Sequence, residues 1–194
     1  SISKERIDEE LYKILKGNNP DNGVTMLFDL NLIPYIAPEL EHHKEQAVTG
    51  ARTGHDYISK LALMMMENTP NDVLVMCKRL KMSNTQIKML HTFVSSMQNI
   101  MDDSSSASII KYGHEFYKVL GNEYLRYLSS VDKSVKDLID YIISGPAVHI
   151  LPNELMQLGV PKGPEIGKLV NKQKELWYSK PMISKDEMLR RIKL

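Results

Sequence analysis

Residues 3–20 read SKERIDEELYKILKGNNP, and this stretch sets the pattern that most of the chain follows. Ser3 is suited to cap a helix, and Ile7, Leu11 and Ile14 then recur at the spacing of one helix face. The Gly-Asn-Asn-Pro that closes the stretch is a typical helix end. The stretch therefore predicts a short helix with one apolar side.

The same signals recur along the chain and predict an all-α protein. A second helix should begin near Pro20 and end where Asn31 can adopt a left-handed conformation. No alternating β-branched run is long enough for a sheet. Antiparallel helix pairs joined by short loops would give a curved, solenoid-like stack. Residues that favour helix starts indicate four further helices: Thr69, Ser83 with Gln86, Asp132, and Ser184 with Glu187.

Two breaks in this pattern are also readable. A serine-rich joint covers residues 102–106, and a turn-rich connector covers residues 145–163.

Composition bounds the class of protein. The chain has 194 residues, of which 42% are hydrophobic and 25% charged, so it can bury a sizeable core. Its one cysteine, Cys77, excludes a disulfide within a monomer and fits a reducing cytoplasm. No apolar run approaches the roughly 20 residues that span a bilayer, and the first residues lack the apolar core of a signal peptide. We therefore expect a soluble, cytoplasmic protein without a membrane partner.

Charge is distributed unevenly along the chain. Residues 1–160 carry 16 Lys or Arg against 20 Asp or Glu, whereas residues 161–194 carry 9 against 4. A segment with a balance of +5 could face a polyanion, because Lys and Arg release counterions when they neutralise phosphates. A solvated helix face is the alternative interpretation.

Catalytic motifs are missing, and the histidines give only a weak signal. The sequence contains no Gly-x-x-x-x-Gly-Lys-Ser/Thr, no Gly-x-Ser-x-Gly and no His-Glu-x-x-His. His42, His43 and the pair His55-Asp56 could hold a divalent ion, as in a metal-dependent phosphohydrolase of the HD type. Surface or capping histidines are the alternative.

The segment PKGPEIGK, which contains Gly163, carries the most information. Pro164 suits the first position of a helix, and Gly167 permits close approach of another backbone. Free N–H groups at this helix start, flanked by Lys162 and Lys168, could bind a phosphate. A tightly packed helix entry, with Gly167 against a neighbour, is the alternative.

Trp177 and Tyr178 follow in the same predicted helix. Their aromatic faces could stack on a nucleobase, as happens in single-strand binding. With Leu169, Val170 and Leu176 nearby, packing in the core is equally compatible with the sequence.

Two stretches at opposite ends together resemble one family. Residues 2–11 are similar to the Ser-x-Glu-Arg-Ile-x-x-Glu-Leu helix of bacterial class II tRNA nucleotidyltransferases, the CCA-adding enzymes, and of poly(A) polymerases. As in that family, an Asn-Pro follows, then a leucine-rich helix and the Pro-Glu-Leu of residues 38–40. Residues 158–169 resemble the family's Leu-Gly-x-x-x-Gly-Pro-Glu-Ile-Gly-x-Leu. Residues 149–155 read HILPNEL where the family often has Pro-Ile-x-Gly-x-Asp-Leu.

The resemblance implies a head, neck, body and tail architecture. Residues 1–16 would be the end of the neck helix, 17–145 a helical body and 146–194 a tail with basic helices. The parent enzyme would use Mg²⁺, held in a catalytic head that this chain lacks, to transfer nucleotidyl groups from CTP and ATP to an RNA 3′ end. This chain would hold tRNA or another RNA and be inactive alone.

The resemblance and the charge together suggest roles for particular residues. No catalytic residue, metal ligand or cofactor is expected in this chain. Glu5 and Arg6 would support the parent's head. A helical scaffold for protein interaction, with no RNA role, is the remaining alternative. The cations expected to contact RNA phosphates are Lys162, Lys168, Lys172, Arg190 and Arg191.

Overall fold

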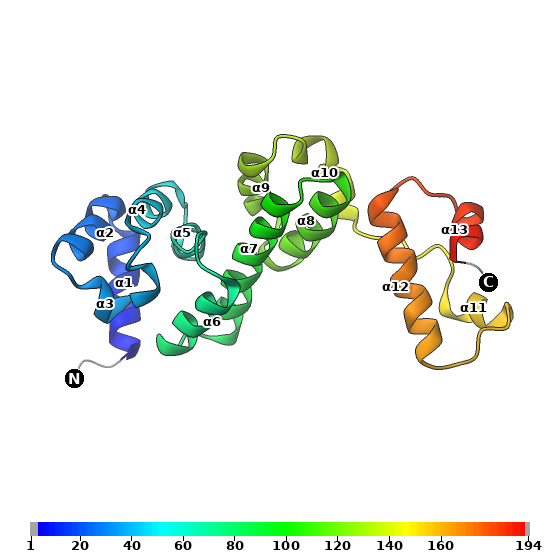
Figure 1. The fold of residues 1–194 in the computed structure, drawn as a ribbon, viewed down its shortest axis with the longest axis horizontal. Coiled ribbons are helices and arrows are strands. Elements are labelled where there is room, and N and C mark those ends of the chain that lie inside the picture. The colour runs from blue at the N-terminus through cyan, green and yellow to red at the C-terminus, as the bar shows by residue number, and fades with distance from the viewer. Residues whose placement is uncertain (1–3, 193–194) are drawn as a thin grey trace. The chain divides into compact units, whose positions relative to one another are not determined.

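The computed structural model describes residues 4–192, and within them it is all-α, as predicted. This part of the chain contains thirteen α-helices and two 3-10 helices and no strand (Figure 1). It divides into two compact units between Gln98 and Asn99. The boundaries after residues 16 and 145 suggested by the family resemblance stay predictions. No described helix is long and apolar enough to cross a membrane.

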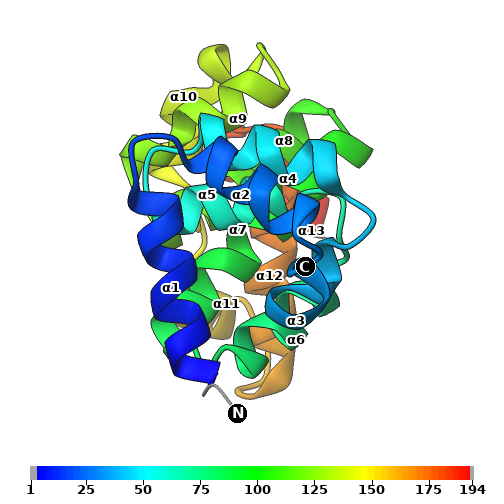
Figure 2. The ribbon, with the colours of Figure 1, turned by 90° about the vertical axis from the view of Figure 1, so that its left-hand side faces the viewer.

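The first unit contains six α-helices, a 3-10 helix and the start of a seventh α-helix. Their bounds are α1 Lys4–Lys16, α2 Pro20–Asp29, α3 Ile33–Ile36, η1 Pro38–Leu40, α4 Lys44–Thr53, α5 Tyr57–Met64, α6 Pro70–Arg79 and α7 Asn84–Asp102. Figure 2 shows α1 and α2 of this unit joined by a short connection, which residues 17–19 form.

Most of the predicted helix ends are confirmed. Asn31 has φ 52°, and the N–H of the next residue bonds back to the carbonyl of Leu27, which closes α2. The Thr69 side chain accepts from the backbone N–H of Asp72 at the start of α6. Ser83 and Gln86 form a reciprocal capping box before α7. The proposed cap Ser3 lies outside the described residues.

Helix α5 is fixed to its neighbours by close backbone approach and by partly buried polar contacts. A Cβ added to Gly50 of α4 would lie 2.3 Å from the backbone nitrogen of Met64, so only glycine allows α4 and α5 this close. The Tyr57 hydroxyl donates to the carboxylate of Asp8 in α1. Burial, together with that carboxylate, raises the pKa of Tyr57. The Lys60 ammonium donates to the last turn of α1, at the carbonyl of Leu15.

Two consecutive methionines at the end of α5 lie in the core of this unit. Met64 and Met65 are fully buried, and Cys77 lies buried in α6. Burial raises the pKa of the Cys77 thiol to about 11, so this cysteine is an unreactive core residue at neutral pH.

A partly buried ion pair links α6 to η1. The guanidinium of Arg79 lies 2.5 Å from the Glu39 carboxylate and donates to the Ile36 carbonyl at 2.6 Å. The two charged side chains are 20% and 9% exposed. Glu39 belongs to the Pro-Glu-Leu that resembles the nucleotidyltransferase family, and its role in this fold is structural.

The second unit contains the end of α7 and the remaining helices. Their bounds are α8 Ser106–Leu120, η2 Asn122–Tyr124, α9 Leu125–Val131, α10 Val135–Ser144, α11 Pro152–Gln157, α12 Pro164–Ser179 and α13 Lys185–Ile192. Ser105, within the predicted serine-rich joint, caps α8. The predicted connector contains α11, a helix of six residues that its turn-rich sequence did not indicate.

The connector leaves α10 at a position that only glycine can occupy. Gly145 has φ 67°, and an added Cβ would lie 2.1 Å from the ring of His114 in α8. The Nδ1 atom of that ring lies 2.9 Å from the Ile142 carbonyl. The imidazole therefore fills the space where α10 ends.

Replacing Arg79 by methionine should destabilise the first unit. The change would leave the Glu39 carboxylate without its cation in a site that is 9% exposed, at a cost of about 3–5 kcal/mol in the free energy of unfolding. Urea denaturation followed by circular dichroism measures this loss. Lys78→Met, at the exposed neighbouring position, is the control. Equal urea midpoints for the Arg79 and Lys78 variants would contradict a stabilising role for the Arg79–Glu39 ion pair.

Candidate nucleic-acid interface

The described part of the predicted tail segment, residues 146–192, is organised by one buried side chain. Gln173 of α12 is fully buried, and its amide bonds both backbone groups of Ile150 in the connector. The Oε1 atom accepts from the Ile150 N–H at 2.9 Å, and Nε2 donates to the Ile150 carbonyl at 3.0 Å. Both polar groups of that buried residue are thereby satisfied, and the connector is held along α12.

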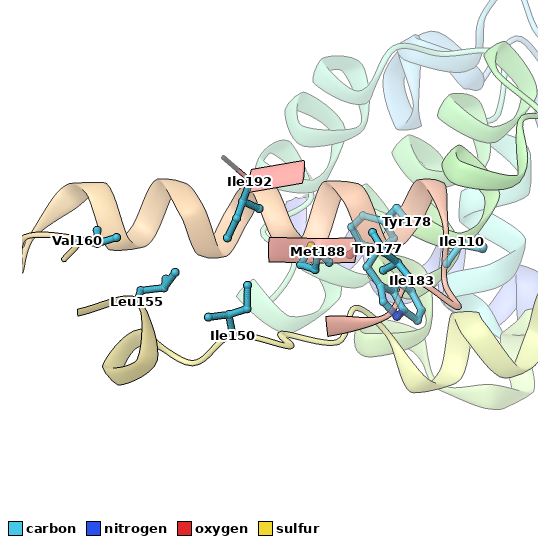
Figure 3. Close-up of a cluster of buried hydrophobic side chains, with 9 residues drawn as sticks. All are labelled: Ile110, Ile150, Leu155, Val160, Trp177, Tyr178, Ile183, Met188 and Ile192. Atoms are coloured by element: carbon cyan, nitrogen blue, oxygen red, sulfur yellow. The ribbon is translucent and has the colours of Figure 1, made fainter. Parts of the chain in front are cut away.

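An apolar cluster surrounds this contact. Figure 3 shows side chains from the connector, α12 and α13 pointing toward one another, with one contribution from α8. The buried members are Ile110, Ile150, Leu155, Val160, Trp177, Tyr178, Ile183, Met188 and Ile192.

Trp177 and Tyr178 pack in this apolar cluster, which is one of the two roles compatible with the sequence. They are 4% and 9% exposed, and their ring centres lie 5.9 Å apart at 75°. The Trp177 ring also meets the edge of Tyr141, with the centres 6.2 Å apart. The hypothesis that these rings stack on a nucleobase is wrong for this conformation, because their faces are covered.

The turn before α12 depends on two glycines. Gly159 has φ 92° and follows α11, where the Val160 N–H bonds the Leu155 carbonyl. Gly163 has φ 142° and ψ −153°, a region essentially restricted to glycine. Pro164 then occupies the first turn of α12, as predicted.

Gly167 has a different environment from the one expected. It is exposed, and a Cβ added there would meet no described atom within 4 Å. The expectation of a close backbone approach at Gly167 is wrong for the described part of the chain. The backbone at Gly167 is open to solvent instead.

All five predicted RNA contacts are exposed, and the structure brings several of them together. Lys168 and Lys172 lie one turn apart on α12. The Lys172 ammonium donates to the Ile192 carbonyl at 3.3 Å, which sets the last turn of α13, with Arg190 and Arg191, beside it.

Carboxylates occupy part of this basic face. The Lys168 ammonium lies 3.3 Å from Glu165. Glu187 contacts Lys180 at 2.9 Å and also Arg191 at 2.9 Å. The hydrogen bond from Lys180, with support from Arg191, lowers the pKa of the Glu187 carboxyl. Exposed pairs of this kind contribute little to stability, so another anion can replace the carboxylate.

Three of the five cations have no ion pair among the residues that the structure describes. These are Lys162 in the loop before α12, Lys172, whose ammonium meets only a backbone carbonyl, and Arg190 of α13. Sequence reasoning did not single out Lys180 or Lys185, whose ammonium pairs with Glu154. It also missed Gln173, although a polar residue in the apolar stripe of a helix is a readable signal.

Arg6 lies in the first unit, away from these residues in the sequence. Its exposed side chain lines an apolar groove of about 600 Å³ between α1, α2 and α3. Tyr35, which is 70% exposed, lines the same groove. The side chain of Glu5 lies outside the described residues.

The candidate metal ligands do not come together. Asp56 caps α5 by accepting from the Ser59 N–H, and His55 contacts Asp56 at 3.4 Å. His43 instead contacts Glu67 at 2.9 Å. Among residues with described side chains, no group of three or more His, Cys, Asp or Glu could hold a metal ion. This geometry favours capping and surface roles over a phosphohydrolase centre.

Comparison with known proteins agrees with the motifs at the two ends. Residues 1–44 match a family described as the probable RNA and SrmB-binding site of polymerase A. The mitochondrial CCA tRNA nucleotidyltransferase 1 of Homo sapiens is 24% identical over 205 aligned residues, covering 99% of this chain and 46% of the human protein. The CCA-adding enzyme of Levilactobacillus brevis is 26% identical over 180 residues, covering 87% and 45%.

The chain is similar to the C-terminal region of a tRNA nucleotidyltransferase or poly(A) polymerase. The predicted resemblance is therefore confirmed. The chain spans about half the length of the curated relatives it matches. The alignments also cover the middle of the chain, where the sequence motifs alone gave no match.

Replacing Gln173 by leucine should loosen the tail segment. The apolar side chain keeps the volume but leaves the N–H and carbonyl of Ile150 buried without partners, at about 1–3 kcal/mol each. Trp177 fluorescence during urea denaturation should show an earlier transition, and the Ile150 amide should exchange faster. The control is Asn171→Leu, an exposed position on the same helix. An unchanged amide exchange rate at Ile150 would show that the Gln173 hydrogen bonds do not hold the connector.

Proposed function

We propose that this chain is the RNA-holding C-terminal part of a tRNA nucleotidyltransferase or poly(A) polymerase. The observation that carries the proposal is the basic face of α12 and α13, in a chain similar to enzymes named for CCA addition. The matched family's description, which names RNA, supports the same function for residues 1–44.

The basic side chains would contact RNA phosphates and recognise the shape of the RNA, and they would not read its bases. Lys168 and Lys172 extend from one side of α12, and Arg190 and Arg191 lie at the end of α13 beside them. Lys162 adds a charge next to the solvent-exposed first turn of α12. Because the nearby aromatic rings are buried, no stacking platform is present among the described tail residues. Double-helical RNA such as an acceptor stem is recognised in this way.

The wider activity belongs to the proposed parent protein. Its catalytic head would transfer nucleotides from CTP and ATP to the RNA 3′ end with Mg²⁺, in the cytoplasm, while this chain positions the RNA. The isolated chain would be inactive. Arg6 would contact that head, and the apolar groove beside it is a surface on which another protein segment can pack.

The proposal predicts salt-sensitive retention of tRNA by the isolated chain, with no turnover of CTP or ATP. Each lost phosphate contact should reduce the slope of log affinity against log salt by about 0.7–0.9. The double variant Lys168→Gln with Arg190→Gln should therefore bind more weakly and with a shallower slope. Filter binding at several salt concentrations measures both quantities.

A charge-matched control comes from the first unit. Lys78→Gln with Lys88→Gln removes two exposed cations from α6 and α7 and should leave tRNA binding unchanged. Affinity that does not respond to salt, or an equal loss in both double variants, would count against the proposed basic face.

A further inference from the structure

A second polar site lies in the second unit, apart from the residues considered so far. It is a surface hollow of about 530 Å³ at α9, α10 and the 3-10 helix before α9. Its polar lining consists of Asn122, Glu123, Arg126, Ser129, Ser130 and Lys136.

Two cations face this hollow, and one of them is oriented by a ring. The guanidinium carbon of Arg126 lies 5.1 Å from the ring centre of Tyr127, and Nη2 donates to the Tyr127 hydroxyl at 3.2 Å. Lys136 of α10 is exposed and has no ion pair among the described residues. Glu123 contributes the one carboxylate of the lining, so the hollow carries an excess of positive charge.

Among the remaining polar groups, the Asn122 amide can donate or accept, whereas the two serines and Glu123 serve as hydrogen-bond acceptors. The Ser129 hydroxyl donates to the Leu125 carbonyl at 3.3 Å, and the Ser130 hydroxyl donates to the Tyr127 carbonyl at 2.7 Å. Each hydroxyl has a single hydrogen, which these bonds use, so each oxygen can still accept a further hydrogen bond. The Glu123 carboxylate also accepts and cannot donate when ionised.

A ligand that combines an anion with a hydroxyl donor is complementary to these two cations and these acceptors. The ribose-phosphate backbone of RNA has both, because each phosphate is followed by a 2′-hydroxyl that DNA lacks. We propose that the hollow binds the RNA backbone, with the phosphate on Arg126 and Lys136 and the 2′-hydroxyl on Glu123 and the serine oxygens. This inference rests on the proposed RNA-holding function and adds a place where RNA is distinguished from DNA.

The test compares an RNA hairpin carrying a single-stranded 3′ end with its all-deoxy counterpart, using the whole chain. Lys136→Gln should weaken RNA binding about fivefold at 0.1 M salt, the effect of losing one phosphate contact with a slope of about 0.7. Lys133→Gln, an exposed lysine just before α10 that does not line the hollow, should have no such effect.

A second variant tests the acceptor. Glu123→Leu removes a negative charge, so it should strengthen binding of the DNA hairpin. It should also lower the ratio of RNA to DNA affinity about three- to tenfold, because the 2′-hydroxyl loses a charged acceptor. If the carboxylate only repelled nucleic acid, both affinities would rise and the ratio would stay constant.

The outcomes separate this inference from the proposed function. If the unaltered chain binds RNA but Lys136→Gln behaves like Lys133→Gln, the hollow is not a binding site and the RNA-holding function stands. A constant RNA-to-DNA ratio in Glu123→Leu likewise overturns the assignment of the 2′-hydroxyl. If the unaltered chain binds neither hairpin, both proposals fail. Circular dichroism of each variant confirms that it is folded.

Discussion

The amide of Gln173 is the contact on which the geometry of the tail segment depends. A buried backbone N–H and carbonyl need partners, and in the connector both find them on this one side chain. Once Ile150 is held, the apolar residues of α11 and of the following turn lie against α12. The same attachment therefore determines where the two glycines bring the chain back to the start of α12.

Local physical chemistry explains why so much of the fold was predictable. A left-handed Asn31, a Thr69 cap and the Ser83–Gln86 box each depend on residues within a few positions of one another. The unpredicted features join distant positions. Arg79 and Glu39 are 40 residues apart, and Gln173 reaches back 23 residues to Ile150. Helix α11 was missed because six residues carry too little periodicity to stand out from a turn.

The candidate interface was predictable in outline for a similar reason. Counting charges identifies the basic C-terminal segment, and the motif around Gly163 identifies its first helix. Counting does not show that carboxylates such as Glu187 lie among these cations, because that depends on how α13 packs on α12. It also cannot decide whether Trp177 and Tyr178 face solvent or the core. Their burial follows from the cluster that the connector completes.

The position of Glu187 between Lys180 and Arg191 has a consequence for selectivity. These cations of the tail segment are therefore already paired with a carboxylate of the same chain before any ligand binds. A sparse or weakly charged anion gains little by displacing a carboxylate that is tethered to the same helix. A ligand whose charges are closely spaced can replace several carboxylates in one event, and the displaced groups then return to water. Glu187 would thus weaken the binding of sparsely charged anions and favour ligands with closely spaced charges.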